Sequence, residues 1–128
     1  MSGALIKSEI YMFVCLKFIG DFLDLKDYQN KASETAIYPK KLDGGVYYAA
    51  IGLAGEVGEL LNKIKKIARD NAELDVEGVK GELGDVLWYC SQIATELGID
   101  MNEVADYNLK KLEDRKRRGV IGGNGDNR

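Results

Sequence analysis

The sequence predicts an all-α protein, most simply a four-helix bundle, and three observations carry this prediction. Apolar residues recur at spacings of three and four over long stretches, which is the period of a helix. No alternating strand pattern of useful length occurs, and the 128 residues include a single proline. Residues that begin or end helices bound each stretch. A chain of this length suits one domain with its own core.

The first helix of the body is predicted to run from its cap at Asp24 to Tyr38. The Asp24 side chain can accept a hydrogen bond from the first turn, where Asp27 complements the helix dipole. Pro39 is expected to end this helix, because the residue before a proline is disfavoured in the helical conformation. The loop PKKLDGG follows.

The second and third helices are predicted over residues 47–68 and 79–97, with the polar segment RDNAELDVEG between them. Gly98 occupies the position after a helix that glycine favours. The second helix has a long apolar series: Ala50, Leu53, Ala54, Val57, Leu60, Leu61, Ile64 and Ile67. These residues cover more of its circumference than a four-helix monomer buries, so we expect a homodimer or a homotetramer.

The fourth helix is predicted to begin after Asp100, with Glu103 three residues on as in a capping box, and to end at Gly119. The tail over 119–128 contains four glycines. It can therefore wrap closely round a ligand, or it is a frayed end of the chain.

Residues 1–21 are interpreted as an N-terminal extension, helical or poorly ordered, ahead of a domain over 22–128. The apolar run from Ile10 to Ile19 is too short to span a bilayer, and no small-x-small cleavage site follows it. Cys15 and Cys90 lie far apart in apolar sequence, which favours buried free thiols over a disulfide. We therefore expect a cytoplasmic protein with no membrane partner.

The composition excludes several classes of function. The net charge is −3 and the body of the chain has no basic block, which argues against a nucleic-acid duplex as partner. The chain has no histidine, so Ser-His-Asp catalysis and zinc sites with imidazole ligands are excluded. The same absence argues against the di-iron bundle, which needs Glu-x-x-His on two helices.

Two pairs of acids lie on the apolar faces of the second and third helices. Most acidic pairs at this spacing fall at helix starts or in polar breaks, where they cap the helix or face water. At 100° per residue, however, Glu82 points the same way as the apolar series Val86, Tyr89, Ile93 and Leu97, with Asp85 at its edge. Glu56 likewise shares its direction with Leu53, Leu60 and Ile67, and Glu59 lies one step towards the polar side.

Acids in such positions need a counter-charge. Lys63 and Lys66 are expected near Glu59, but the apolar stripe offers no cation to Glu82. A divalent cation between the two helices meets this need, and ligation by oxygen alone suits Mg²⁺ or Mn²⁺. Glycines recur beside the acids at Gly52, Gly55, Gly58, Gly81 and Gly84. They indicate either close helix contact or space for a ligand.

The stretch GLAGEVGEL followed by GELGDVLWY resembles the MazG-like all-α nucleoside triphosphate pyrophosphohydrolases, whose signature is E-x-x-E, a gap, then E-x-x-D. The resemblance runs from about Leu25 to the C-terminus. It implies Mg²⁺-dependent cleavage of a nucleoside triphosphate between the α and β phosphates, giving the monophosphate and pyrophosphate. The family's metal ligands and catalytic acids match Glu56, Glu59, Glu82 and Asp85.

The resemblance also implies residues that bind the substrate. The family pattern Asn-x-x-Lys-Leu-x-x-Arg is matched by Asn108, Lys111, Leu112 and Arg115, expected to hold sugar and phosphate. Tyr89 resembles an aromatic contact to the nucleotide, and the ending GGNGDNR would place Arg128 over the triphosphate. Members are dimers or tetramers, in some of which the sites lie between subunits. Charge suggests that Glu59 orients the attacking water and that Lys111 and Arg115 stabilise the leaving pyrophosphate.

Two alternatives remain open on the sequence. The same fold serves phosphoribosyl-nucleotide pyrophosphohydrolases, although the pair Trp88 and Tyr89 favours a ligand with a base that can stack, unless both rings are core. A different class is a non-catalytic helical oligomerisation module, in which the acids meet lysines of a partner subunit.

Overall fold

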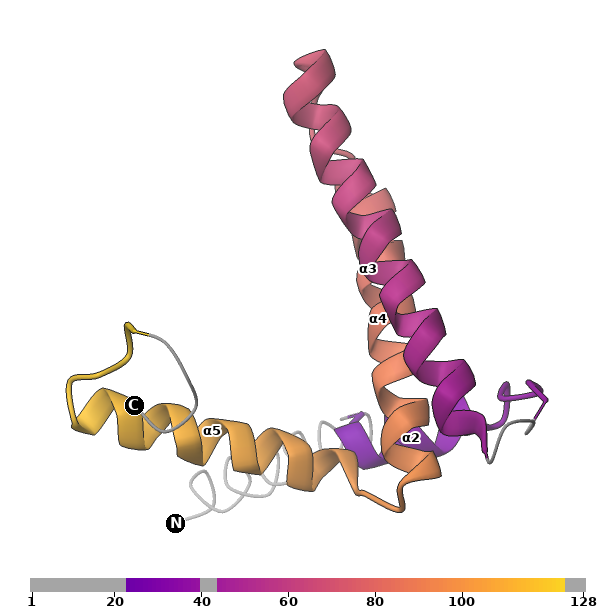
Figure 1. Cartoon of the computed structure of the whole chain (residues 1–128), viewed down its shortest axis with the longest axis vertical. Coiled ribbons are helices and arrows are strands. Elements are labelled where there is room, and N and C mark those ends of the chain that lie inside the picture. Colours follow the sequence, from indigo (N-terminus) through magenta and orange to yellow (C-terminus); the bar gives the residue numbers. More distant parts are fainter. Residues whose placement is uncertain (1–22, 40–43, 124–128) are drawn as a thin grey trace, which may run out of the picture.

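The computed structural model describes residues 23–39 and 44–123, and these ranges contain four helices and no strand (Figure 1). The helices are α2 (Leu25–Ser33), α3 (Gly45–Asp70), α4 (Val76–Glu96) and α5 (Met101–Arg117). The predicted all-α class is therefore confirmed. The extension over 1–21 lies outside the described residues, as does the end of the tail over 124–128.

The predicted end of the first helix is wrong. Asp24 caps α2 as expected, accepting from the backbone N–H of Asp27 at 2.7 Å, but the helix stops at Ser33 rather than Tyr38. There the Ser33 hydroxyl donates to the carbonyl of Gln29 at 2.8 Å, and the Thr35 hydroxyl donates to the carbonyl of Ala32 at 2.7 Å. Such hydroxyls compete with the backbone N–H groups for carbonyls and end the helix before Pro39 is reached.

The other helices are found where they were predicted, with ends shifted by a few residues. The helix predicted over 79–97 is α4, and it begins three residues earlier, at Val76. Asp75 caps it by accepting a hydrogen bond from the N–H of Gly78 at 2.9 Å. Asp100 caps α5 through the N–H of Asn102 at 2.8 Å. Gly98 and Gly119 adopt φ angles of 68° and 70°, the left-handed conformation that closes a helix.

The helices α3 and α4 form an antiparallel pair, and the other two lie at its base. Figure 1 shows α2 crossing the C-terminal end of α4, while α5 packs against α2 and extends away from the pair. Within the described residues, α3 and α4 are therefore not enclosed by two further parallel helices. None of the described helices is long and apolar enough to cross a membrane.

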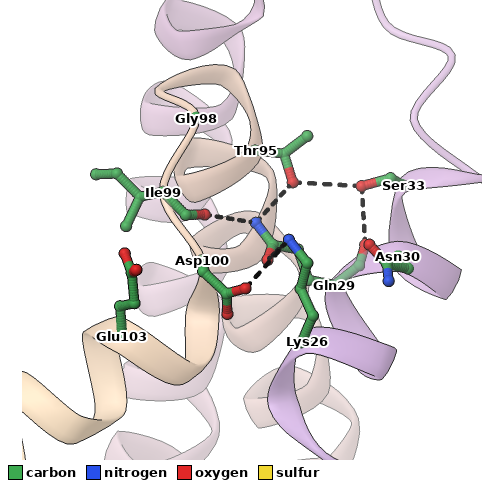
Figure 2. Close-up of a pocket in the computed structure, with 9 residues that line it drawn as sticks. All are labelled: Lys26, Gln29, Asn30, Ser33, Thr95, Gly98, Ile99, Asp100 and Glu103. Atoms are coloured by element: carbon green, nitrogen blue, oxygen red, sulfur yellow. Dashed lines mark hydrogen bonds and ion pairs between the residues drawn. The ribbon is translucent and has the colours of Figure 1, made fainter.

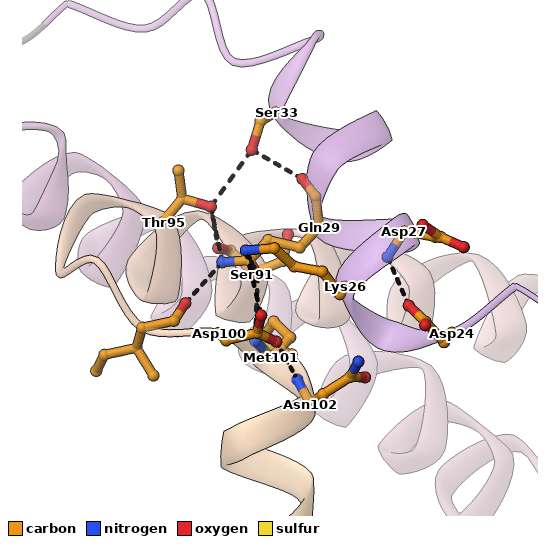
Figure 3. Close-up of polar contacts among 11 residues, drawn as sticks. Asp24, Lys26, Asp27, Gln29, Ser33, Ser91, Thr95, Asp100, Met101 and Asn102 are labelled. Carbon is orange, nitrogen blue, oxygen red and sulfur yellow. Dashed lines mark hydrogen bonds and ion pairs between the residues drawn. The ribbon is translucent and has the colours of Figure 1, made fainter.

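A polar contact fastens α2 to the turn between α4 and α5 (Figure 3). The Gln29 side chain is 3% exposed. Its amide nitrogen donates to the Thr95 hydroxyl at 3.1 Å and to the Ile99 carbonyl at 2.9 Å, and its oxygen accepts from the N–H of Met101 at 3.2 Å. Lys26 adds an ion pair with Asp100 at 3.4 Å. One glutamine thus holds three segments together.

Few apolar residues in the described part of the chain are buried. The buried apolar residues among those described are Ala32, Ala49, Ala94 and Met101. Large apolar side chains remain exposed along the pair and along α5, among them Ile51, Leu61, Ile64, Leu83, Leu87, Tyr107 and Leu112. Cys90 is a free, half-buried thiol whose pKa is raised by burial, while Cys15 lies outside the described residues.

Candidate metal centre

Three of the four predicted acids meet between α3 and α4. Glu56 comes from α3, and Glu82 and Asp85 come from α4. One carboxylate oxygen of each lies within 4.8 Å of the others, so the three can hold one metal ion. Glu56 and Glu82 are half-buried and Asp85 is exposed. We call these three residues the carboxylate cluster.

The Glu56 carboxyl lies in an unfavourable electrostatic environment. Burial raises the pKa of the Glu56 carboxyl, and the negative charges of Asp85, Glu82 and Glu59 raise that pKa further. Like charges at this distance disfavour ionisation, and a bound cation relieves them. The arrangement therefore favours a positive ion among its oxygens.

Glu59, the fourth predicted acid, is exposed and is not one of the three converging residues. It lies one turn of α3 beyond Glu56, near enough for its charge to raise the pKa of that carboxyl. Glu59 is therefore a solvent-accessible neighbour of the cluster.

The expectation that Glu82 has no cation is wrong. The ammonium of Lys63 lies 3.4 Å from a carboxylate oxygen of Glu82, and this ion pair joins α3 to α4. The sequence contained a signal for it, since Lys63 stands seven residues after Glu56 and so lies two turns along the same helix face. The period of α3 alone puts Lys63 near Glu59, four residues before it, and carries no information about the facing helix α4.

Tyr89 lies beside the cluster, packed on Gly52 of the facing helix. A Cβ atom at Gly52 would overlap the Tyr89 ring, so the close-contact explanation holds for this glycine. Burial raises the pKa of Tyr89, as do the nearby Tyr48, Glu56 and Asp85. At the other four glycines of the two motifs, a Cβ atom would meet no atom within 4 Å and would face open space: Gly55, Gly58, Gly81 and Gly84.

The aromatic residues around Tyr89 form a contiguous group. The ring of Trp88 meets that of Tyr89 edge-on at 4.9 Å between centroids, and Tyr38 stacks on Tyr48 at the same separation. The Trp88 N–H donates to the Thr35 hydroxyl at 2.8 Å. Trp88 thus has a structural role, because it holds the segment after α2 against α4.

The predicted residues of the fourth helix are not brought to the cluster within one chain. Asn108 is exposed, Lys111 is half-buried and Arg115 is buried. All three belong to α5, which extends away from the α3–α4 pair (Figure 1). Arg128 lies outside the described residues. The roles of these four residues stay predictions.

One neighbour of the cluster was not predicted. Burial raises the pKa of Tyr28 on α2, and the charge of Asp85 raises it further, so Tyr28 lies near that carboxylate. No sequence pattern indicates this position, because it depends on α2 crossing α4.

A cavity of about 430 Å³ lies apart from the cluster, between α2 and the start of α5 (Figure 2). Its lining includes Lys26, Gln29, Thr95 and Asp100. These side chains form hydrogen bonds and an ion pair with one another, as Figure 2 shows. They therefore hold the helices together and do not indicate a ligand site.

Comparison with known proteins agrees with the geometry. The family model of the MazG nucleotide pyrophosphohydrolase domain matches residues 49–120, which include the whole carboxylate cluster and all of α5. The chain belongs to this MazG domain family. It is also 47% identical over 109 residues to the Gene 37 protein of Mycobacterium phage L5, covering 79% of this chain and 96% of the relative. No solved structure gives a significant match.

Membership of the MazG family supports nucleotide pyrophosphohydrolase activity for this chain. The cluster occupies the positions of the two acidic motifs within the matched range. The name of the phage relative states no activity, so the relative gives no information about the substrate.

Proposed function

We propose that this protein hydrolyses nucleoside triphosphates between the α and β phosphates, releasing a nucleoside monophosphate and pyrophosphate. The observation that carries the proposal is the convergence of Glu56, Glu82 and Asp85 from two helices of a MazG domain. A non-catalytic helical module would have no need to gather acids that repel each other.

The donor set fits a hard divalent cation. The cluster offers carboxylate oxygens, and such ligands suit Mg²⁺ or Mn²⁺. We propose that Glu56, Glu82 and Asp85 hold Mg²⁺, and that Glu59 joins them from the solvent side. When bound, the ion neutralises phosphate oxygens and lowers the pKa of coordinated water.

The protein's own groups have separate roles in this proposal. Glu59, at the exposed edge, orients the attacking water and takes its proton. We propose that the Tyr89 ring, which lies against Gly52 next to the cluster, contacts the nucleoside of a bound triphosphate. Its neighbour Trp88 fixes the ring edge-on.

We further propose that a second copy completes the site, in a homodimer or homotetramer. Two observations support this: α5 lies away from the cluster of its own chain, and apolar side chains of α3 such as Ile51 and Leu61 are exposed. A second α5 packed on that surface would bring Asn108, Lys111 and Arg115 towards the phosphates and stabilise the leaving pyrophosphate.

A substrate panel tests the proposal. The protein is incubated with Mg²⁺ and each canonical and modified ribo- and deoxyribonucleoside triphosphate, and with a phosphoribosyl-nucleotide substrate, and the products are separated by anion exchange. We expect equimolar monophosphate and pyrophosphate from at least one triphosphate. Release of orthophosphate, or turnover of the phosphoribosyl compound alone, would contradict the proposed reaction.

A further inference from the structure

The ion pair between Lys63 and Glu82 differs from an ordinary surface pair. Glu82 is 18% exposed and Lys63 is 33% exposed, whereas Lys80 and Glu77, paired on the outside of α4, are 73% and 81% exposed. Charges withdrawn from water are screened less by solvent and salt. Lys63 also bonds across two helices, to a carboxylate that belongs to the cluster.

The position of the Lys63 ammonium is restricted by its surroundings. It lies over Gly78 in the first turn of α4, where an added Cβ atom would be 3.0 Å from the nitrogen. It also borders a cavity of about 270 Å³, which Lys66 lines as well. The ammonium therefore lies at the boundary between the carboxylate cluster and this cavity.

We propose that Lys63 is the resident counter-cation of the cluster, which neutralises Glu82 in the metal-free protein and competes with a divalent cation for that carboxylate. This inference rests on the proposed metal centre. Binding of the ion then exchanges one cation for another at Glu82. The affinity for metal is lower than three unpaired acids would give, and the acids stay together when the ion leaves.

Titration with MnCl₂, followed by the electron paramagnetic resonance signal of free Mn²⁺, tests the competition directly. Lys63→Met removes the competitor, so we expect Mn²⁺ to bind about two- to fivefold more tightly. Lys66→Met is the matched control, because it removes the same charge from the same helix. The charge of Lys66 acts on Asp70, at the end of α3. Lys63→Arg keeps a cation and should bind Mn²⁺ with nearly the wild-type affinity.

A second readout uses the metal-free protein. Lys63→Met should lower the melting temperature, and this effect should disappear in a Glu82→Gln background because the pair is already broken. If the wild type binds Mn²⁺ but Lys63→Met binds it no more tightly than Lys66→Met, the role of Lys63 is wrong and the metal centre stands. If the wild type does not bind Mn²⁺ at all, the metal centre is wrong and the competition falls with it.

Discussion

At the scale of single residues, Glu56 and Glu82 have different neighbours although both belong to the cluster. Glu56 is half-buried, and three negative side chains raise its pKa in addition to burial. Glu82 has the ammonium of Lys63 at 3.4 Å. Removing one charge or the other should therefore have different consequences for the metal-free protein.

We predict that Glu56→Gln abolishes Mg²⁺-dependent turnover but raises the melting temperature of the metal-free protein at pH 7, by roughly 2 °C or more. A raised pKa in the folded state means that stability is lost as the pH rises through that pKa. Glutamine mimics the protonated acid, so the gain should shrink towards zero at pH 4. Differential scanning calorimetry at the two pH values measures it.

Glu82→Gln is the matched comparison for this prediction. It also removes a cluster acid, but it leaves the Lys63 ammonium without its carboxylate, so we expect no rise in the metal-free melting temperature. A Glu56→Gln protein that melts below the wild type at pH 7 would show that repulsion at Glu56 is not significant.

At the scale of the helices, the attachment of α2 depends on Gln29. We predict that Gln29→Leu destabilises the protein by about 2–3 kcal/mol, because the buried N–H of Met101 and the carbonyl of Ile99 lose their partner. The exposed neighbour Asn30 provides the control, and Asn30→Ala should change stability by less than about 0.5 kcal/mol. Urea denaturation measures both, and equal values would contradict the role of Gln29.

The contact between α3 and α4 gives a second prediction at this scale. Gly52→Ala should destabilise the pair by about 1–3 kcal/mol, because the Tyr89 ring has to move. Gly55→Ala, three residues along the same helix in open space, should be neutral or should stabilise by up to about 1 kcal/mol. Thermal melts of the two variants measure the difference. An unchanged melting temperature for Gly52→Ala would mean that the Tyr89 ring does not pack tightly on this glycine.

The helices and the cluster were predictable because local signals determine them. Asp24, Asp100 and Gly98 act within one turn, and a spacing of three residues puts two acids on one face of a helix. The end of α2 and the pairing of Lys63 depend instead on competition and on contacts between helices. No periodicity within one segment encodes such contacts, and the path of α5 was unpredictable for the same reason.

At the scale of the whole molecule, the exposed apolar side chains of α3 support the proposed assembly of two or more copies. Ile51 is 72% exposed and Leu61 is 59% exposed on α3, although Leu61 belongs to the apolar series of that helix. We predict that Leu61→Lys converts a homodimer or homotetramer into a monomer, because a charge would be buried in the interface. Light scattering coupled to size exclusion measures the mass.

Ile37→Lys is the control for this prediction, since Ile37 is exposed on the segment after α2 and outside the apolar series of α3. It should leave the assembly unchanged. A wild-type protein that is monomeric and active at micromolar concentration would rule out the completion of the site by a second copy.

In the proposed reaction, the carboxylate cluster makes pyrophosphate release depend on a divalent cation. Asp85→Asn tests it most directly, because Asp85 is exposed and its replacement should leave the fold intact. Glu77→Gln removes an acid from the same helix outside the cluster. The measurement is the rate of pyrophosphate release from the preferred triphosphate as Mg²⁺ is titrated. We predict a loss of at least about 100-fold for Asp85→Asn and nearly wild-type rates for Glu77→Gln, and equal rates for the two variants would contradict the account.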